Sequence, residues 1–80
     1  MNEKKKYLLI LSALSRAGGS SDEMSKEIQI ECIPDELKFK IEEEKNNWDT
    51  TLQRVMQEIN LTSDGVLGYV TVSIKQVLPL

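Results

Sequence analysis

The chain has 80 residues and a net charge of −3, and 40% of its residues are hydrophobic and 29% charged. Those proportions are typical of a soluble globular protein, and we expect one domain over residues 1–80. The sequence holds no histidine and a single cysteine, Cys32. This excludes an internal disulfide and a cysteine-based metal cage, and it removes the commonest general base. We therefore predict a cytoplasmic protein that is not an enzyme and needs no metal or cofactor.

The first predicted element is a helix over residues 3–17. Tyr7, Leu8, Leu11 and Leu14 fall at helical spacing, and Gly18-Gly19 would end the helix because glycine readily adopts a left-handed conformation. The apolar run follows three lysines, as in a signal peptide, but it is too short to span a membrane. We interpret it as a helix packed in the core.

A second helix is predicted to begin near Ser20, because Ser20 and Glu23 have the spacing of a capping box. Its apolar face would hold Met24, Ile28 and Cys32. The stretch from Ile28 to Glu31 alternates apolar and polar residues, so a short strand there is an open alternative.

Pro34 interrupts the pattern, and Asp35 and Glu36 suit the first turn of a third helix. Leu37 and Ile41 would share one face of that helix, while Phe39 lies off it. The glutamates and asparagines that follow, residues 42–47, are predicted to be a polar connector or a frayed helix end.

A further helix is predicted from Asn46 or Asn47 to Asn60, because its apolar positions repeat with a period of 3.6. Those positions are Trp48, Leu52, Val55, Met56 and Ile59. Leu61-Thr62 would begin a strand, and a turn at Ser63-Asp64-Gly65 would lead into a second strand from Tyr69. The chain would then finish as a helix followed by a β-hairpin.

The polar face of this helix carries residue types that read DNA. Arginine pairs with guanine, glutamine and asparagine pair with adenine, and threonine contacts a thymine methyl or a phosphate. The predicted DNA-binding residues are Asn47, Thr50, Thr51, Gln53, Arg54 and Gln57. Double-stranded DNA is accordingly one predicted partner.

The order of these elements is that of a small winged helix-turn-helix domain of the α+β class, with three or four helices followed by a C-terminal hairpin. The chain resembles the N-terminal winged-helix domains of Mrr-type restriction systems, in the first-helix ending Leu11–Gly19 and in Trp48, Leu52, Met56 and Ile59. The resemblance implies a recognition helix that begins at Trp48. The family's basic wing is missing, because residues 61–73 hold no lysine or arginine.

Charge favours a second interpretation. Residues 21–47 hold four lysines against nine carboxylates, a net −5, whereas a nucleic-acid binder normally has a basic surface. An acidic surface would instead bind a basic protein partner, with Glu42, Glu43 and Glu44 as the predicted contacts. A phage-type inhibitor of a nucleic-acid-binding defence protein is one form of such a module. For either interpretation, a homodimer would supply the avidity that a weakly binding monomer lacks.

Overall fold

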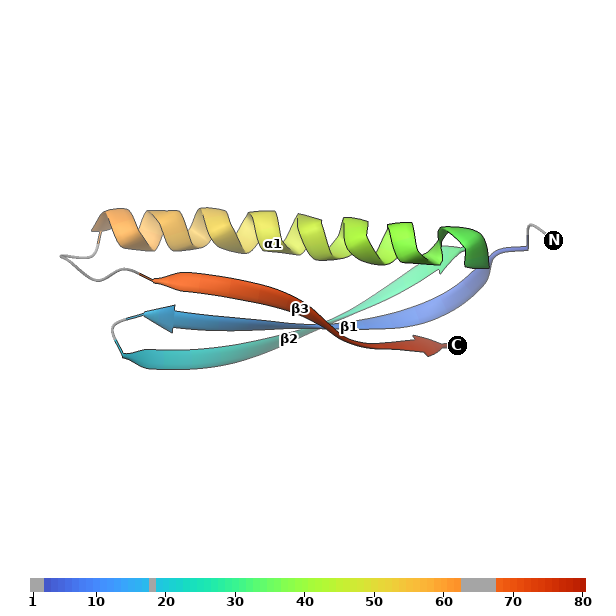
Figure 1. The fold of residues 1–80 in the computed structure, drawn as a ribbon, viewed down its shortest axis with the longest axis horizontal. Helices are drawn as coiled ribbons and strands as arrows, with labels where there is room; N and C mark the ends of the chain where they lie inside the picture. Colours follow the sequence, from blue (N-terminus) through green and yellow to red (C-terminus); the bar gives the residue numbers. More distant parts are fainter. Residues whose placement is uncertain (1–2, 18, 63–67) are drawn as a thin grey trace.

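The computed structural model describes residues 3–17, 19–62 and 68–80. The elements are β1 (Lys5–Ala17), β2 (Ser20–Cys32), the 3-10 helix η1 (Pro34–Glu36), α1 (Leu37–Thr62) and β3 (Tyr69–Pro79). The strands form one antiparallel sheet in the order β2-β1-β3, and α1 covers one of its faces (Figure 1). The protein is α+β, but the predicted winged helix-turn-helix with three or four helices and a C-terminal hairpin is wrong.

The two layers are matched in length. A helix of 26 residues is about 39 Å long at 1.5 Å per residue, and a strand of 13 residues is about 43 Å long at 3.3 Å per residue. Because β2 and β3 both run antiparallel to β1, they are parallel to each other, and α1 is the crossover that such a pair requires. The molecule is therefore elongated, with extents of 55 × 17 × 13 Å.

The segment predicted as the first helix is the central strand β1. Its buried side chains alternate with less buried ones, as a strand requires. The buried set is Tyr7, Leu9, Leu11 and Ala13. Leu8 and Ile10 on the opposite face are also apolar, so the period of two is hidden in a continuous apolar run. Such a run does not distinguish a buried strand from a helix.

The segment predicted as the second helix is strand β2, which pairs with β1 along its whole length. The short strand proposed for Ile28–Glu31 is confirmed and extends back to Ser20. Ser20 and Glu23 do not form a capping box, because no helix begins there. The chain reverses between the paired residues Ala17 and Ser20, where Gly19 has a φ of +85°. That left-handed conformation suits a tight hairpin turn and is unstrained only for glycine.

The helix predicted after Pro34 is confirmed, but it does not stop at residue 42. Pro34–Glu36 forms one 3-10 turn, and α1 then continues from Leu37 to Thr62. Residues 42–47, predicted to be a polar connector or a frayed helix end, lie inside α1. The side chains turned toward the sheet are four residues apart, or seven apart across the glutamates, so they lie one or two helical turns apart on the same face of α1. They are Leu37, Ile41, Trp48, Leu52 and Met56.

The core between the layers has two clusters. Near the start of α1, Leu37 and Ile41 pack against Tyr7, Ile30 and Cys32. Near its end, the helix packs against the other half of the sheet; this cluster holds Ala13, Trp48, Leu52, Met56, Val70 and Val72. Leu9 and Leu11 in the central strand are completely buried. The fold is thus held by one long helical stripe on one sheet face.

The strand predicted from Tyr69 is confirmed, and Val70 and Val72 are buried on one side of it. Its partner was wrongly predicted, because β3 pairs with β1 and Leu61-Thr62 belongs to α1. The predicted turn at Ser63-Asp64-Gly65 lies outside the described residues. The register between β1 and β3 shifts after Ile10 and omits Lys75, as in a β-bulge.

Candidate functional site

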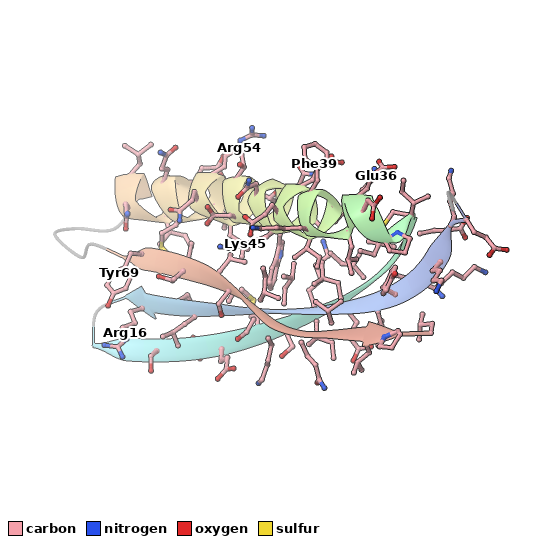
Figure 2. The ribbon with its side chains drawn as sticks, turned by 45° about the vertical axis from the view of Figure 1, so that its right-hand side comes forward. Arg16, Glu36, Phe39, Lys45, Arg54 and Tyr69 are labelled. Carbon is pink, nitrogen blue, oxygen red and sulfur yellow. The ribbon has the colours of Figure 1, made fainter. Side chains whose placement is uncertain are left out.

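The six residues predicted to bind DNA all lie on α1 and all are exposed. Arg54 projects from the helix away from the sheet (Figure 2). Thr50 and Gln57 lie four residues before and three residues after Arg54, so they share its side of the helix. The helix therefore brings Thr50, Arg54 and Gln57 together on its outer surface.

Two of the predicted DNA-binding side chains make contacts within the protein. The Gln53 amide donates to the backbone oxygen of Val70 at 2.9 Å and to the Asp49 carboxylate at 3.2 Å. The Thr51 hydroxyl donates to the backbone oxygen of Asn47 at 3.0 Å. Gln53 thus links α1 to the outer edge of β3, a structural role that the sequence did not reveal.

The three glutamates predicted to bind a basic partner do not form one patch. They are consecutive residues of α1, so each points about 100° around the helix from the previous one. Glu42 is exposed, whereas Glu43 and Glu44 are half-buried. Only Glu42 and Glu43 are placed to act with other groups on the outer side of the helix.

Phe39 is the strongest feature of that outer side. Its side chain is 67% exposed, and it projects away from the sheet beside Glu36 (Figure 2). Helix neighbours lie three and four positions apart, so carboxylates come one turn before Phe39 and one turn after it. We call this set the Phe39 surface; it consists of Asp35, Glu36, Phe39, Glu42 and Glu43. The sequence signal was present, since Phe39 lies off the apolar stripe.

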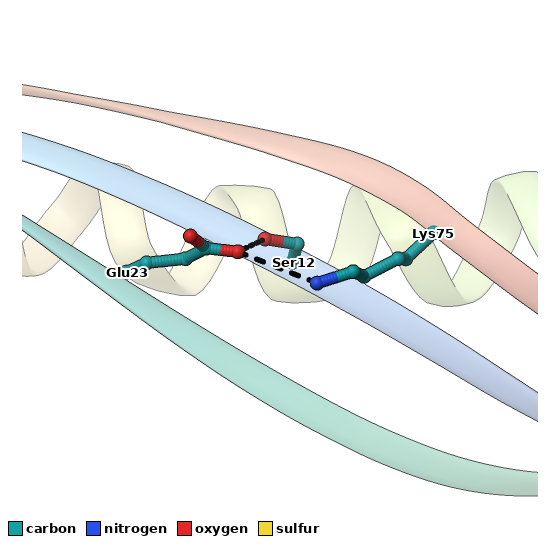
Figure 3. Close-up of polar contacts among 3 residues, drawn as sticks. All are labelled: Ser12, Glu23 and Lys75. Carbon is teal, nitrogen blue, oxygen red and sulfur yellow. Dashed lines mark hydrogen bonds and ion pairs between the residues drawn. The ribbon is translucent and has the colours of Figure 1, made fainter.

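The sheet face opposite α1 carries mixed side chains. Glu23 of β2 accepts a hydrogen bond from the Ser12 hydroxyl at 3.0 Å and forms an ion pair with Lys75 of β3 at 3.6 Å (Figure 3). Arg16 and Tyr69 are paired across β1 and β3 at one end of this face (Figure 2). A shallow depression of about 210 Å³ lies beside Lys6 and Glu31. Its volume is below the roughly 300 Å³ of the smallest ligand pockets.

The described residues contain no group of three His, Cys, Asp or Glu side chains that could hold a metal ion. Cys32 is a free thiol that is 3% exposed, and it packs against Tyr7 and Ile30. No helix in residues 3–17, 19–62 and 68–80 is long and apolar enough to cross a membrane. The candidate functional features of the described chain are therefore exposed surfaces and not a metal site or a reactive thiol.

Comparison with protein family models, curated proteins and solved structures finds no match to this chain. The resemblance to Mrr-type domains stays a prediction from a few residues. The winged-helix architecture that it implied is not the architecture of this protein.

Proposed function

We propose that this protein is a non-catalytic interaction module that binds a basic, partly apolar segment of another protein on its Phe39 surface. The observation that carries the proposal is an aromatic side chain, 67% exposed, with carboxylates in the 3-10 turn before it and in the turn of α1 after it. Aromatic residues supply much of the energy of protein interfaces, and the carboxylates around Phe39 make it part of a mixed apolar and acidic surface. The lack of histidine and the buried single thiol fit a binding role in a reducing cytoplasm.

The two components of the Phe39 surface have different effects on binding. Complete burial of a phenylalanine side chain contributes about 1.5–3 kcal/mol, so Phe39 supplies affinity. The carboxylates attract a positively charged partner and reject an acidic one, which gives specificity and a faster association rate. A basic nucleic-acid-binding channel of another protein is one surface with matching chemistry.

DNA binding through Thr50, Arg54 and Gln57 stays a prediction with weaker support. Most non-specific DNA affinity comes from cations that neutralise phosphates. Residues 50–62 of α1 contain one cation, Arg54, and one anion, Glu58. Gln53 donates its amide to Val70 and Asp49 instead of to a base.

A peptide-display selection on the immobilised protein tests the proposal. We expect enrichment of peptides that combine Lys or Arg with an apolar anchor, and loss of binding to them in the Phe39→Ala and Glu43→Lys variants. Leu61→Ala is the matched control, because Leu61 is also exposed on the outer side of α1 but lies far from the carboxylates. Equal binding by the Phe39 variant would contradict the proposal.

A titration with duplex DNA at low salt separates the two hypotheses. We expect no saturable binding. Saturable binding that weakens with salt and on Arg54→Ala would overturn the proposal in favour of DNA.

A further inference from the structure

The two outer strands of the sheet differ in how their edges are covered. At the start of β3, Asn60 of α1 donates to the Gly68 oxygen at 3.1 Å and accepts from the Gly68 nitrogen at 2.7 Å. Gln53 donates to the next accessible oxygen, that of Val70, at 2.9 Å. Two helix side chains therefore occupy backbone groups that would otherwise pair with another strand. The bulge at Lys75 further interrupts this edge.

Strand β2 forms the other edge of the sheet, and α1 packs much less against it than against β3. It pairs with β1 on one side over 13 residues, and no described strand lies on its other side. An edge of this length offers a row of backbone donors and acceptors to an added strand. Glu23, Lys26 and Glu27 are charged residues of this strand. They repel an added strand that places like charges opposite them, so the charge pattern decides which strand can pair and in which register.

Apolar side chains flank the same edge on the helix side. The helix packs much more closely with β3 than with β2, so Met24 of β2 is 42% exposed. Val55 and Ile59 of α1 are 48% and 42% exposed. They follow Trp48 by seven and eleven residues, which places them on its side of the helix. That side faces β2, because Lys26 of β2 lies 5.8 Å from the centre of the Trp48 ring.

A second copy of the chain can pair with β2 about a twofold axis only if the strands are antiparallel and one residue faces its own copy across the axis. We call that residue the centre of the pairing. Residues equally far from that residue then face each other. Centres at Glu23, Lys26 or Glu27 place a charge opposite itself. A centre at Ser25 places Glu23 opposite Glu27, and a centre at Gln29 places Glu27 opposite Glu31. Like charges directly opposite destabilise a strand pair.

Centres near either end of β2 pair only a short part of the strand. Among the five central positions, from Met24 to Ile28, only Met24 and Ile28 avoid every such clash. The centre at Ile28 places Lys26 opposite Ile30 and forms no opposite-charge pair. The centre at Met24 places Asp22 opposite Lys26 twice and Glu23 opposite Ser25. It also brings the two Met24 side chains together beside Val55 and Ile59 of both copies, so it satisfies charge and apolar contacts at once.

We propose that two copies of this protein associate through their β2 edges, in the register that places Met24 on the twofold axis. The three strands of each copy then form one continuous sheet, with both helices on the same face. The Phe39 surface lies on the outer side of α1 and stays accessible in this dimer. The proposal rests on the β2 edge and the apolar residues of α1 beside it, and it does not depend on the proposed function.

Charge exchange tests the register. In sedimentation equilibrium, the native protein should dimerise, and the Asp22→Lys and Lys26→Asp variants should each raise the dimer dissociation constant about tenfold or more. The double variant, Asp22→Lys with Lys26→Asp, should restore most of the native affinity, because both ion pairs are re-formed with reversed sign. Both substituted positions are exposed, and circular dichroism verifies that each variant is folded. A monomeric native protein, or a double variant no better than either single one, would overturn the proposal.

Disulfide trapping tests the position of the axis. Residues directly opposite in an antiparallel pair have Cβ atoms about 4.5–5.5 Å apart, so Met24→Cys should cross-link two copies under mild oxidation. Gln29→Cys is the matched control, since it is equally accessible on β2 but lies far from its own copy in this register. Cys32 is 3% exposed and does not compete. Cross-linking of the Gln29 variant, or none of the Met24 variant, would contradict the register.

Discussion

Lys75 of β3 and Glu23 of β2 form an ion pair that reaches across the central strand β1, with 3.6 Å between Nζ and Oε1 (Figure 3). The Ser12 hydroxyl of β1 donates to the same oxygen at 3.0 Å. Lys75 is the residue that the β1–β3 register omits. The bulge therefore places Lys75, the one lysine of β3, where it reaches across β1 to the opposite edge strand, β2.

Despite this position, the ion pair should contribute little to stability. Both side chains are more than half exposed, and ion pairs between exposed groups contribute about 0–1 kcal/mol. Glu23→Gln should lower the free energy of unfolding by less than about 1 kcal/mol in urea denaturation. The difference from the control Glu27→Gln should shrink in about 1 M salt, where charges are screened within about 3 Å. A loss that salt leaves unchanged would instead assign the effect to the hydrogen bond from Ser12.

The two faces of β1 should respond very differently to truncation. Leu11 is completely buried, whereas Leu14 is 38% exposed on the opposite face. Leu11→Ala should lower the free energy of unfolding by about 2–5 kcal/mol, and Leu14→Ala by less than about 1 kcal/mol. Chemical denaturation of both variants measures the contrast. Similar losses would contradict the strand, because in a helix these residues are three apart and share one face.

Leu11 and Leu14 also explain why the first half of the fold was not predictable from local pattern. Both are apolar although they face opposite sides, and leucine and alanine favour helices. The decisive fact is that β1 receives hydrogen-bonded neighbours on both sides, which is a long-range property. β2 was more predictable, because alternation is visible at Ile28–Glu31, but the spacing of Ser20 and Glu23 imitated a helix start.

The second half of the fold was predicted more accurately, because the sequence signals of its helix are local. Pro34 and the acidic residues after it mark a helix start, and Trp48, Leu52 and Met56 form its buried stripe. The error at residues 42–47 came from treating a polar run as a break, although the stripe continues on the other side of the helix. The same error separated Phe39 from Glu42 and Glu43, which hid the Phe39 surface.

Asn60 should be important for the position of β3. Its amide both donates to and accepts from the backbone of Gly68, and an unpaired partner would cost about 1–3 kcal/mol. We expect Asn60→Ala to lower stability by that amount and to speed hydrogen exchange at the Gly68 amide. Gln57→Ala is the control, because Gln57 is an exposed amide on the same helix. Unchanged exchange at Gly68 would show that the strand holds without this contact.

Cys32 should report the opening of the whole domain. Its side chain is 3% exposed and packs between Tyr7 and Ile30, so a thiol reagent should reach it only through unfolding or a large local opening. Leu11→Ala lies outside its contacts yet should speed labelling about tenfold for each 1.4 kcal/mol of lost stability, since labelling then follows the population of the open state. Phe39→Ala removes an exposed side chain and should leave the rate unchanged. If Leu11→Ala also left the rate unchanged, Cys32 would become exposed by a local movement near β2 and η1, and the two core clusters would not unfold as one unit.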